Sequence, residues 1–165
     1  MRSQNDTRVL VLAPVGRDAQ LASDALIRSG LDARACSGIE ELCSCIRDGA
    51  AVTIVGEEAL TPHAIECIRP VLEDQPSWSD LPFVILTTGG RSTELSLSHV
   101  ALIEKLGHVT LLERPIRFVT LITAVRAGLR SRQRQYELRD HIEALHASER
   151  APSESEAQVA RPPHP

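Results

Sequence analysis

The run Pro82-Phe83-Val84-Ile85-Leu86-Thr87 (residues 82–87) is a short apolar stretch that follows a polar connection. Such a run is typical of a β-strand buried on both faces, as in a parallel sheet. Similar runs stand at 8–13 and 51–55, and shorter strands are expected at 31–36 and 109–112. The sequence therefore predicts five strands.

Segments with apolar residues at helical spacing separate these strands. In the clearest one, Ile39, Leu42, Cys43 and Ile46 stand at i, i+3, i+4 and i+7. Further helices are expected over 18–29, from Pro62, before Gly107 and from Ile116. Parallel strands require crossover connections that place helices on both faces of a sheet. The predicted fold class is therefore α/β, with a five-stranded doubly wound parallel sheet and an extended C-terminal helix.

The composition is that of a globular protein with an aliphatic core. Hydrophobic residues make up 42% of the 165 residues, whereas aromatic residues make up only 2%. No apolar stretch approaches the roughly 18 to 20 residues of a membrane span, and residues 1–7 are polar with no signal-peptide pattern after them. We therefore expect a flexible N-terminus over 1–7, a cytoplasmic location and no membrane partner.

The four cysteines do not form a recognisable metal motif. Cys43 and Cys45 are two residues apart, and Cys36 and Cys67 supply no second pair at the spacing of a zinc finger. Free cysteines commonly behave as small buried hydrophobes. The sequence therefore predicts neither a metal site nor a cofactor.

In a doubly wound sheet, ligands bind at the carboxyl ends of the strands. At these ends the chain resembles the receiver domains of two-component response regulators, over about residues 8–130, which implies a flavodoxin-like receiver fold. Thr87 resembles the family's switch Thr or Ser after strand four. Arg114-Pro115 resembles its Lys-Pro after strand five, where the proline usually follows a cis bond. These are the receiver switch-like residues of the chain.

The same resemblance implies three groups that phosphoryl transfer needs. An aspartate after strand three is the nucleophile, two acids after strand one hold Mg²⁺, and the lysine binds the acyl phosphate. This chain has Gly56 at the acceptor position, and Ala13 and Pro14 replace the acids. Asp18 is interpreted as a helix cap. Arg114 keeps the charge of the lysine but has a different donor geometry.

Gly56 and Glu57 thus mark a degenerate phosphorylation site. A register slip that would bring Glu57 to the acceptor position is disfavoured, because it inverts the faces of the strand. Glu57 or Glu58 either mimics a permanent phosphoryl charge or is a solvated loop carboxylate. We expect no catalytic residue and no enzyme. The predicted function is that of a pseudo-receiver acting as an interaction module in bacterial two-component phosphorelay signalling.

The C-terminal helix is expected to extend past the domain, because no proline occurs between Ile116 and Ala147. The predicted organisation is a receiver-like domain over 8–130, a helical extension over 131–147 and a disordered tail over 148–165. Apolar residues along the helix suggest a coiled-coil seam and a homodimer. The predicted dimer or partner residues are Leu129, Tyr136, Leu138, Ile142 and Leu145.

The segment 109–145, with 75–88, is similar to receiver-like domains at the N-terminus of bacterial sensor histidine kinases. This similarity implies sensor kinases or other two-component proteins as partners.

The sequence leaves two alternative functions open, nucleic-acid binding and the binding of a nucleotide or small molecule. Arginines of the last helix could bind nucleic acid, although an acidic chain of net charge −4 and the interleaved Glu137 and Asp140 disfavour it. The segment 13–17 could be a phosphate loop of a nucleotide or small-molecule binder, but it lacks the glycine spacing and lysine of such loops. The arginines in question are Arg126, Arg130, Arg132, Arg134 and Arg139.

Overall fold

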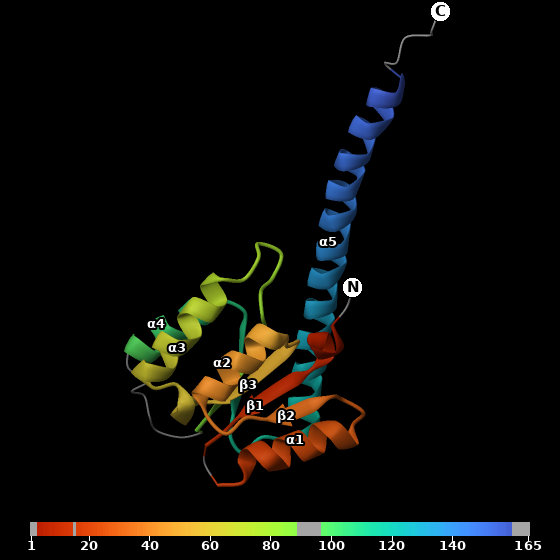
Figure 1. The fold of residues 1–165 in the computed structure, drawn as a ribbon. Coiled ribbons are helices and arrows are strands. Elements are labelled where there is room, and N and C mark those ends of the chain that lie inside the picture. The colour runs from red at the N-terminus through yellow and green to blue at the C-terminus, as the bar shows by residue number, and fades with distance from the viewer. Residues whose placement is uncertain (1–2, 15, 89–96, 160–165) are drawn as a thin grey trace, which may run out of the picture.

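A computed structural model describes residues 3–14, 16–88 and 97–159, and its described part contains the predicted five-stranded parallel sheet. The strand order is β2-β1-β3-β4-β5, with every pair parallel (Figure 1). The three central strands are buried, whereas the edge strands β2 and β5 are partly exposed. The strands are β1 (Val9–Leu12), β2 (Ala33–Ala35), β3 (Val52–Gly56), β4 (Phe83–Thr87) and β5 (Val109–Glu113).

Helices cover both faces of the sheet, which confirms the doubly wound class. The first and last helices pack on one face and the three middle helices pack on the other (Figure 1). Alternate residues of each strand supply the two cores, so Val9 and Val11 face one layer and Leu10 and Leu12 the other. The helices are α1 (Asp18–Arg28), α2 (Ile39–Asp48), α3 (Pro62–Glu73), α4 (Leu97–Leu106) and α5 (Phe118–Val159), with short 3₁₀ helices η1 (Gln4–Thr7) and η2 (Glu57–Ala59).

The N-terminal residues Gln4–Thr7 form the 3₁₀ helix η1, where the sequence analysis expects a flexible segment. Ser3 and Asp6 form a reciprocal capping box around η1. The side-chain amide of Asn5 donates to the carbonyl of Asp48 at 3.1 Å, and Asp6 lies 3.5 Å from Arg139 of α5. These contacts hold the N-terminus beside α5 (Figure 1). Residues 1–2 lie outside the described residues.

The middle of α5 packs on its own domain through a cation–aromatic cluster. The Arg132 guanidinium lies 5.0 Å from the ring centre of Tyr136 and 5.8 Å from that of Trp78. Arg132 also donates to the carbonyl of Ala50 at 3.3 Å and to the hydroxyl of Ser79 at 2.7 Å. Charge-assisted hydrogen bonds and ring contacts of this kind stabilise a buried arginine.

This packing corrects part of the predicted dimer seam. Tyr136 is only 6% exposed, and Leu129 packs against the core formed with α1. Both side chains therefore stabilise the domain itself. Leu138 and Leu145, by contrast, are 50% and 63% exposed, and Ile142 is partly exposed. The part of the helix that remains free for a partner begins after Tyr136.

The helix α5 continues through Val159, whereas the sequence analysis expects a disordered tail from Ser148. The segment contains the good helix formers Ala, Glu and Gln, and extending an existing helix needs no new nucleus. Pro152 within it cannot donate a helical hydrogen bond, so composition alone does not explain the helix there. Residues 160–165 lie outside the described residues. Figure 1 shows α5 projecting well beyond the sheet. Nowhere in the described chain is a helix both long and apolar enough to cross a membrane.

Candidate functional site

The candidate site lies where β3, β4 and β5 end. Gly56 is the last residue of β3 and pairs with Leu86, while Thr87 pairs with Glu113. The turn η2 follows Gly56 directly and places Glu57 and Glu58 at the tip of β3. The expected strand register is therefore correct, and Gly56 occupies the end of the third strand without a slip.

The carboxylate of Glu58 fills the space next to Gly56. A Cβ atom built on Gly56 would lie 2.5 Å from Oε1 of Glu58 and 2.8 Å from its Cδ. Such distances are far below van der Waals contact, so a side chain at position 56 and the present position of Glu58 exclude one another. The space that a side chain at position 56 would take is thus occupied by a carboxylate that reaches back from two residues further along the chain.

Arg114 holds this carboxylate by two parallel hydrogen bonds. Its Nη1 and Nη2 donate to Oε2 and Oε1 of Glu58 at 3.0 and 2.8 Å. Paired bonds of this kind fix both position and orientation. The two side chains are only 20% and 23% exposed. Arg114, which the sequence analysis matches to the receiver lysine, therefore brings a positive charge to the site. This charge binds Glu58 of the same chain.

Asp18 belongs to this site and does not cap a helix. The residue before α1 is Arg17, and no side-chain hydrogen bond caps this helix end. The Oδ2 atom of Asp18 instead lies 3.7 Å from Nη2 of Arg114. Asp18 therefore adds a second negative charge beside the guanidinium, and the interpretation of this residue as a helix cap is wrong.

Electrostatics favour the charged forms of the pair. The hydrogen bonds from Arg114 lower the pKa of Glu58, with burial opposing part of the effect. The same hydrogen bonds raise the pKa of Arg114. Both groups consequently stay ionised across the neutral range, and the pair is permanent at physiological pH.

The second carboxylate contacts the end of β4. Oε1 of Glu57 accepts the backbone N–H of Thr88 at 2.8 Å and a short hydrogen bond from the Thr88 hydroxyl. The hydroxyl of Thr87, the predicted switch residue, instead donates to the carbonyl of Leu112 at 3.4 Å. Sequence reasoning missed Thr88, although the Thr-Thr pair at the strand end was a visible signal.

The peptide bond between Arg114 and Pro115 is cis, as the resemblance implies for the Lys-Pro position. The backbone N–H of Arg114 donates to the carbonyl of Thr87 at 2.8 Å, which joins the ends of β4 and β5. Both oxygens of Glu58 accept from Arg114, and one oxygen of Glu57 accepts from Thr88. Only the Glu58 charge is paired bidentately with Arg114, whereas Glu57 is held by hydrogen bonds from the neutral Thr88. No group of three metal-ligand side chains gathers here among the described residues.

An open cavity of about 620 Å³ adjoins the site between α1 and the start of α5. Its walls are mostly apolar, with Leu21 and Phe118 about half exposed, and Asp18, Thr88 and Arg114 form a polar end. The segment 13–17, weighed as a phosphate loop, contributes no lining residue, and Val15 within it lies outside the described residues.

No protein-family model and no curated protein matches the sequence. Several solved structures resemble the chain, but their sequence identity to it is so low that the similarity shows the fold alone. A response regulator receiver domain protein from Clostridium thermocellum is 18% identical with a TM-score of 0.60, over 77% of this chain and 97% of that one. A structure described as adenylate cyclase from Rhodopirellula baltica is 16% identical with a TM-score of 0.65, over 84% and 98%.

NtrX from Brucella abortus, solved in complex with ADP, is 17% identical with a TM-score of 0.63 over 81% of this chain. The chain spans only 28% of the length of that protein. Together these neighbours show the fold of response-regulator receiver domains, with the flavodoxin-like sheet expected from the sequence. The same fold carries different functions, so function has to be argued from the site.

Replacing Glu58 by Gln should make the protein less stable at pH 7 and less sensitive to acid. A lowered carboxyl pKa in the folded state gives stability that is complete above the unfolded-state value of about 4.3 and is lost as the pH falls through the folded-state pKa. For a pair that is partly exposed, we expect Glu58→Gln to cost roughly 1 kcal/mol at pH 7. Urea unfolding between pH 7 and pH 3 measures the difference.

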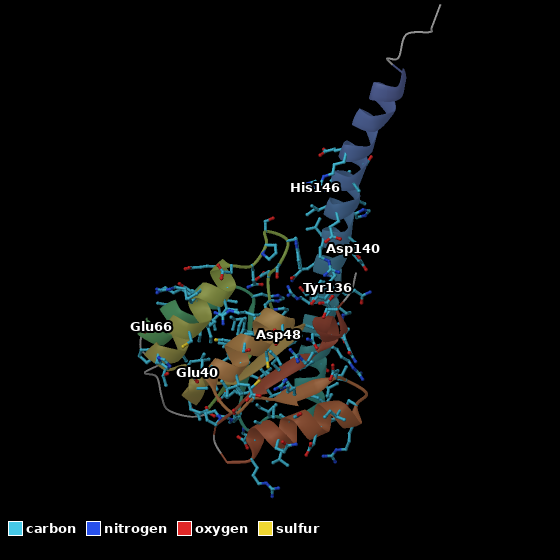
Figure 2. All side chains as sticks on the ribbon, viewed as in Figure 1. Glu40, Asp48, Glu66, Tyr136, Asp140 and His146 are labelled. Carbon is cyan, nitrogen blue, oxygen red and sulfur yellow. The ribbon has the colours of Figure 1, made fainter. Side chains whose placement is uncertain are left out.

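The difference between wild type and Glu58→Gln should shrink below pH ~4.3. Glu66→Gln, which changes an exposed carboxylate of α3 (Figure 2), is the matched control and should change stability little at any pH. A Glu58→Gln protein as stable as wild type at pH 7 would show that the pair with Arg114 contributes nothing.

Proposed function

We propose that this chain is a non-catalytic pseudo-receiver, a protein-interaction module of bacterial two-component signal transduction that works in the cytoplasm. One observation carries the proposal: the Glu58 carboxylate, bound by Arg114, occupies the space of the missing acceptor side chain. Phosphoryl transfer in the resembling family needs an attacking carboxylate and a cation that neutralises charge. This site offers neither in a free form.

Glu58 is a poor substitute for the absent aspartate. Both of its oxygens already accept hydrogen bonds from Arg114, so an attack on phosphorus would first have to break this pair. The acids that would hold Mg²⁺ after the first strand are replaced by Ala13 and Pro14. Without the cation, the charge that develops on the transferring group lacks its main stabilisation.

The two carboxylates support a fixed conformational state. In the resembling family, a phosphoryl group on the third strand is read by the lysine after strand five and the switch residue after strand four. Here Glu58 reaches Arg114 after β5, and Glu57 reaches Thr88 after β4. We infer that these bonds replace the phosphoryl contacts permanently. A modification that does not occur cannot shift a conformational equilibrium, so signalling proceeds by binding of partners.

Two of the five arginines considered for nucleic-acid binding are used in the packing of α5, whereas Arg126, Arg130 and Arg134 are exposed. Arg132 is only 8% exposed, and the Arg139 side chain is 13% exposed and lies between aromatic rings and Asp6. Arginines held in this way are not free to contact phosphates. The partners that we propose are sensor kinases or other two-component proteins, as the sequence resemblance implies.

The cavity beside Arg114 favours a second candidate function, the binding of a small molecule. Its apolar walls and polar end match the usual character of ligand sites. A thermal-shift screen with nucleotides, flavins and small carboxylic acids distinguishes this function, because a pseudo-receiver without a ligand shows no stabilisation.

Incubation with acetyl phosphate and Mg²⁺ should leave the intact mass of the protein unchanged. The reason is that Gly56 lacks a nucleophile and Glu58 is held by Arg114. An active receiver domain treated in parallel serves as the positive control. Addition of one phosphoryl mass to wild type, and its loss in Glu57→Gln or Glu58→Gln, would contradict the proposal.

We also propose that the free end of α5 forms a homodimer. Leu138 and Leu145 are exposed, and with Ile142 they follow the four-and-three spacing of a coiled-coil seam. This seam is short, so its stability depends on concentration. Removal of 131–165 would be a poor test, because Arg132 and Tyr136 are part of the domain's packing.

Size-exclusion chromatography with light scattering should give twice the monomer mass for wild type and the monomer mass for Leu145→Glu. A glutamate in the seam buries an unpaired charge, which strongly disfavours association. Ala144→Glu adds the same charge at an exposed position beside the seam and should remain dimeric. A wild-type protein that is monomeric at every concentration would overturn this part of the proposal.

A further inference from the structure

Three metal-ligand side chains from α2 and α3 meet on the surface, away from the site described above. Glu40 lies in the first turn of α2, and His63 and Cys67 lie four residues apart on α3. Side chains four apart on a helix share one face. Because α2 and α3 pack side by side, that face is turned toward Glu40, which Figure 2 labels on α2.

The distances within this cluster are those of a closed ligand set. Nε2 of His63 lies 3.1 Å from Oε1 of Glu40 and 3.6 Å from Sγ of Cys67, and all three ligand atoms lie within 4.8 Å of one another. Tetrahedral zinc with bonds of about 2.0 to 2.3 Å separates its ligand atoms by roughly 3.3 to 3.8 Å. Small side-chain rotations would therefore suffice to bind an ion.

A second thiol lies beside the cluster. Cys43 is one helical turn after Glu40 on α2 and is buried. Burial raises the pKa of this thiol, and the neighbouring Cys67 and Glu40 raise it further. The Cys43 sulfur is not among the three ligand atoms that gather within 4.8 Å, so water would complete the coordination.

Another group of this kind, Cys36, Glu41 and Cys45, is less suited to an ion. Arg34 and Ser37 already bind the Glu41 carboxylate and, with the backbone of Ser37, lower its pKa to about 2. Burial raises the pKa of Cys36 to about 12, so its thiolate forms with difficulty. The side chains of His63 and Glu40 are instead 66% and 74% exposed, which leaves a path for an ion from solvent.

We propose that Glu40, His63 and Cys67 form a binding site for a borderline-soft divalent cation, zinc in the first instance. A thiolate, an imidazole and a carboxylate are the ligands that zinc takes in proteins. On binding, the S–H bond of Cys67 breaks, the sulfur–zinc bond forms and one proton leaves to solvent, so no oxidant or reductant is needed. The ion would join α2 to α3.

This proposal does not rest on the proposed signalling function. The cation site could not be predicted from residue spacing along the sequence, because its three ligands come from two different helices. Their juxtaposition follows from the packing of two helices against the same face of the sheet. Its failure would leave the pseudo-receiver proposal intact, because the two sites share no residue.

Titration of the reduced protein with Co²⁺ tests the site. We expect a saturable thiolate-to-cobalt charge-transfer band with one equivalent of metal, and its loss when Zn²⁺ is added. Cys67→Ser and His63→Ala should each weaken Co²⁺ binding at least about tenfold, since even outer-shell partners of metal sites have effects of this size. Circular dichroism confirms that the variants are folded, and His63 is exposed enough to be replaced without loss of packing.

Two control variants locate the metal. His141→Ala removes an exposed imidazole of α5, and Cys36→Ser removes a thiol of the other group. Both should bind Co²⁺ as wild type does. The proposal is overturned if wild type gives no saturable band, if Cys67→Ser and His63→Ala bind with wild-type affinity, or if Cys36→Ser abolishes the band.

Discussion

The ion pair between Glu58 and Arg114 is the constraint on which the site depends. It fills the space above Gly56 with a carboxylate and engages the Arg114 guanidinium at the end of β5. A bidentate pair with limited exposure is well oriented and less screened by salt than a surface pair. The ends of β3 and β5 are thereby joined without any chemical modification, and the Glu57 contact to Thr88 joins β3 to β4 in the same way.

The opposite end of the sheet is joined to the long helix by a second set of polar contacts. Arg132 and Tyr136 of α5 both contact the carbonyl of Ala50, and Arg139 reaches Asp6 of the N-terminus. The helix is therefore fixed to its domain for several turns before it projects.

Much of the fold could be predicted from the sequence, because apolar runs and helical periodicity report burial directly. The location of Gly56, Arg114 and Pro115 at the ends of β3 and β5 could be predicted, because the apolar runs show where these strands end. The reach of Glu58 back over Gly56 depends on the turn η2, whose direction no periodic pattern encodes. Tyr136 was assigned to a partner because spacing alone does not distinguish packing within the chain from packing between chains. The capping box of Ser3 and Asp6 stands outside the apolar periodicity from which the strands and helices follow.

The most direct test of the account is a double-mutant cycle between positions 56 and 58. Gly56 has φ −68°, which any residue adopts, so alanine there brings only its methyl group. In wild type this group must push the carboxylate off Arg114, and Gly56→Ala should cost about 1 kcal/mol of unfolding free energy. In the Glu58→Ala background the cost should vanish. Equal effects of Gly56→Ala in the two backgrounds would contradict the claim that Glu58 occupies the space beside Gly56.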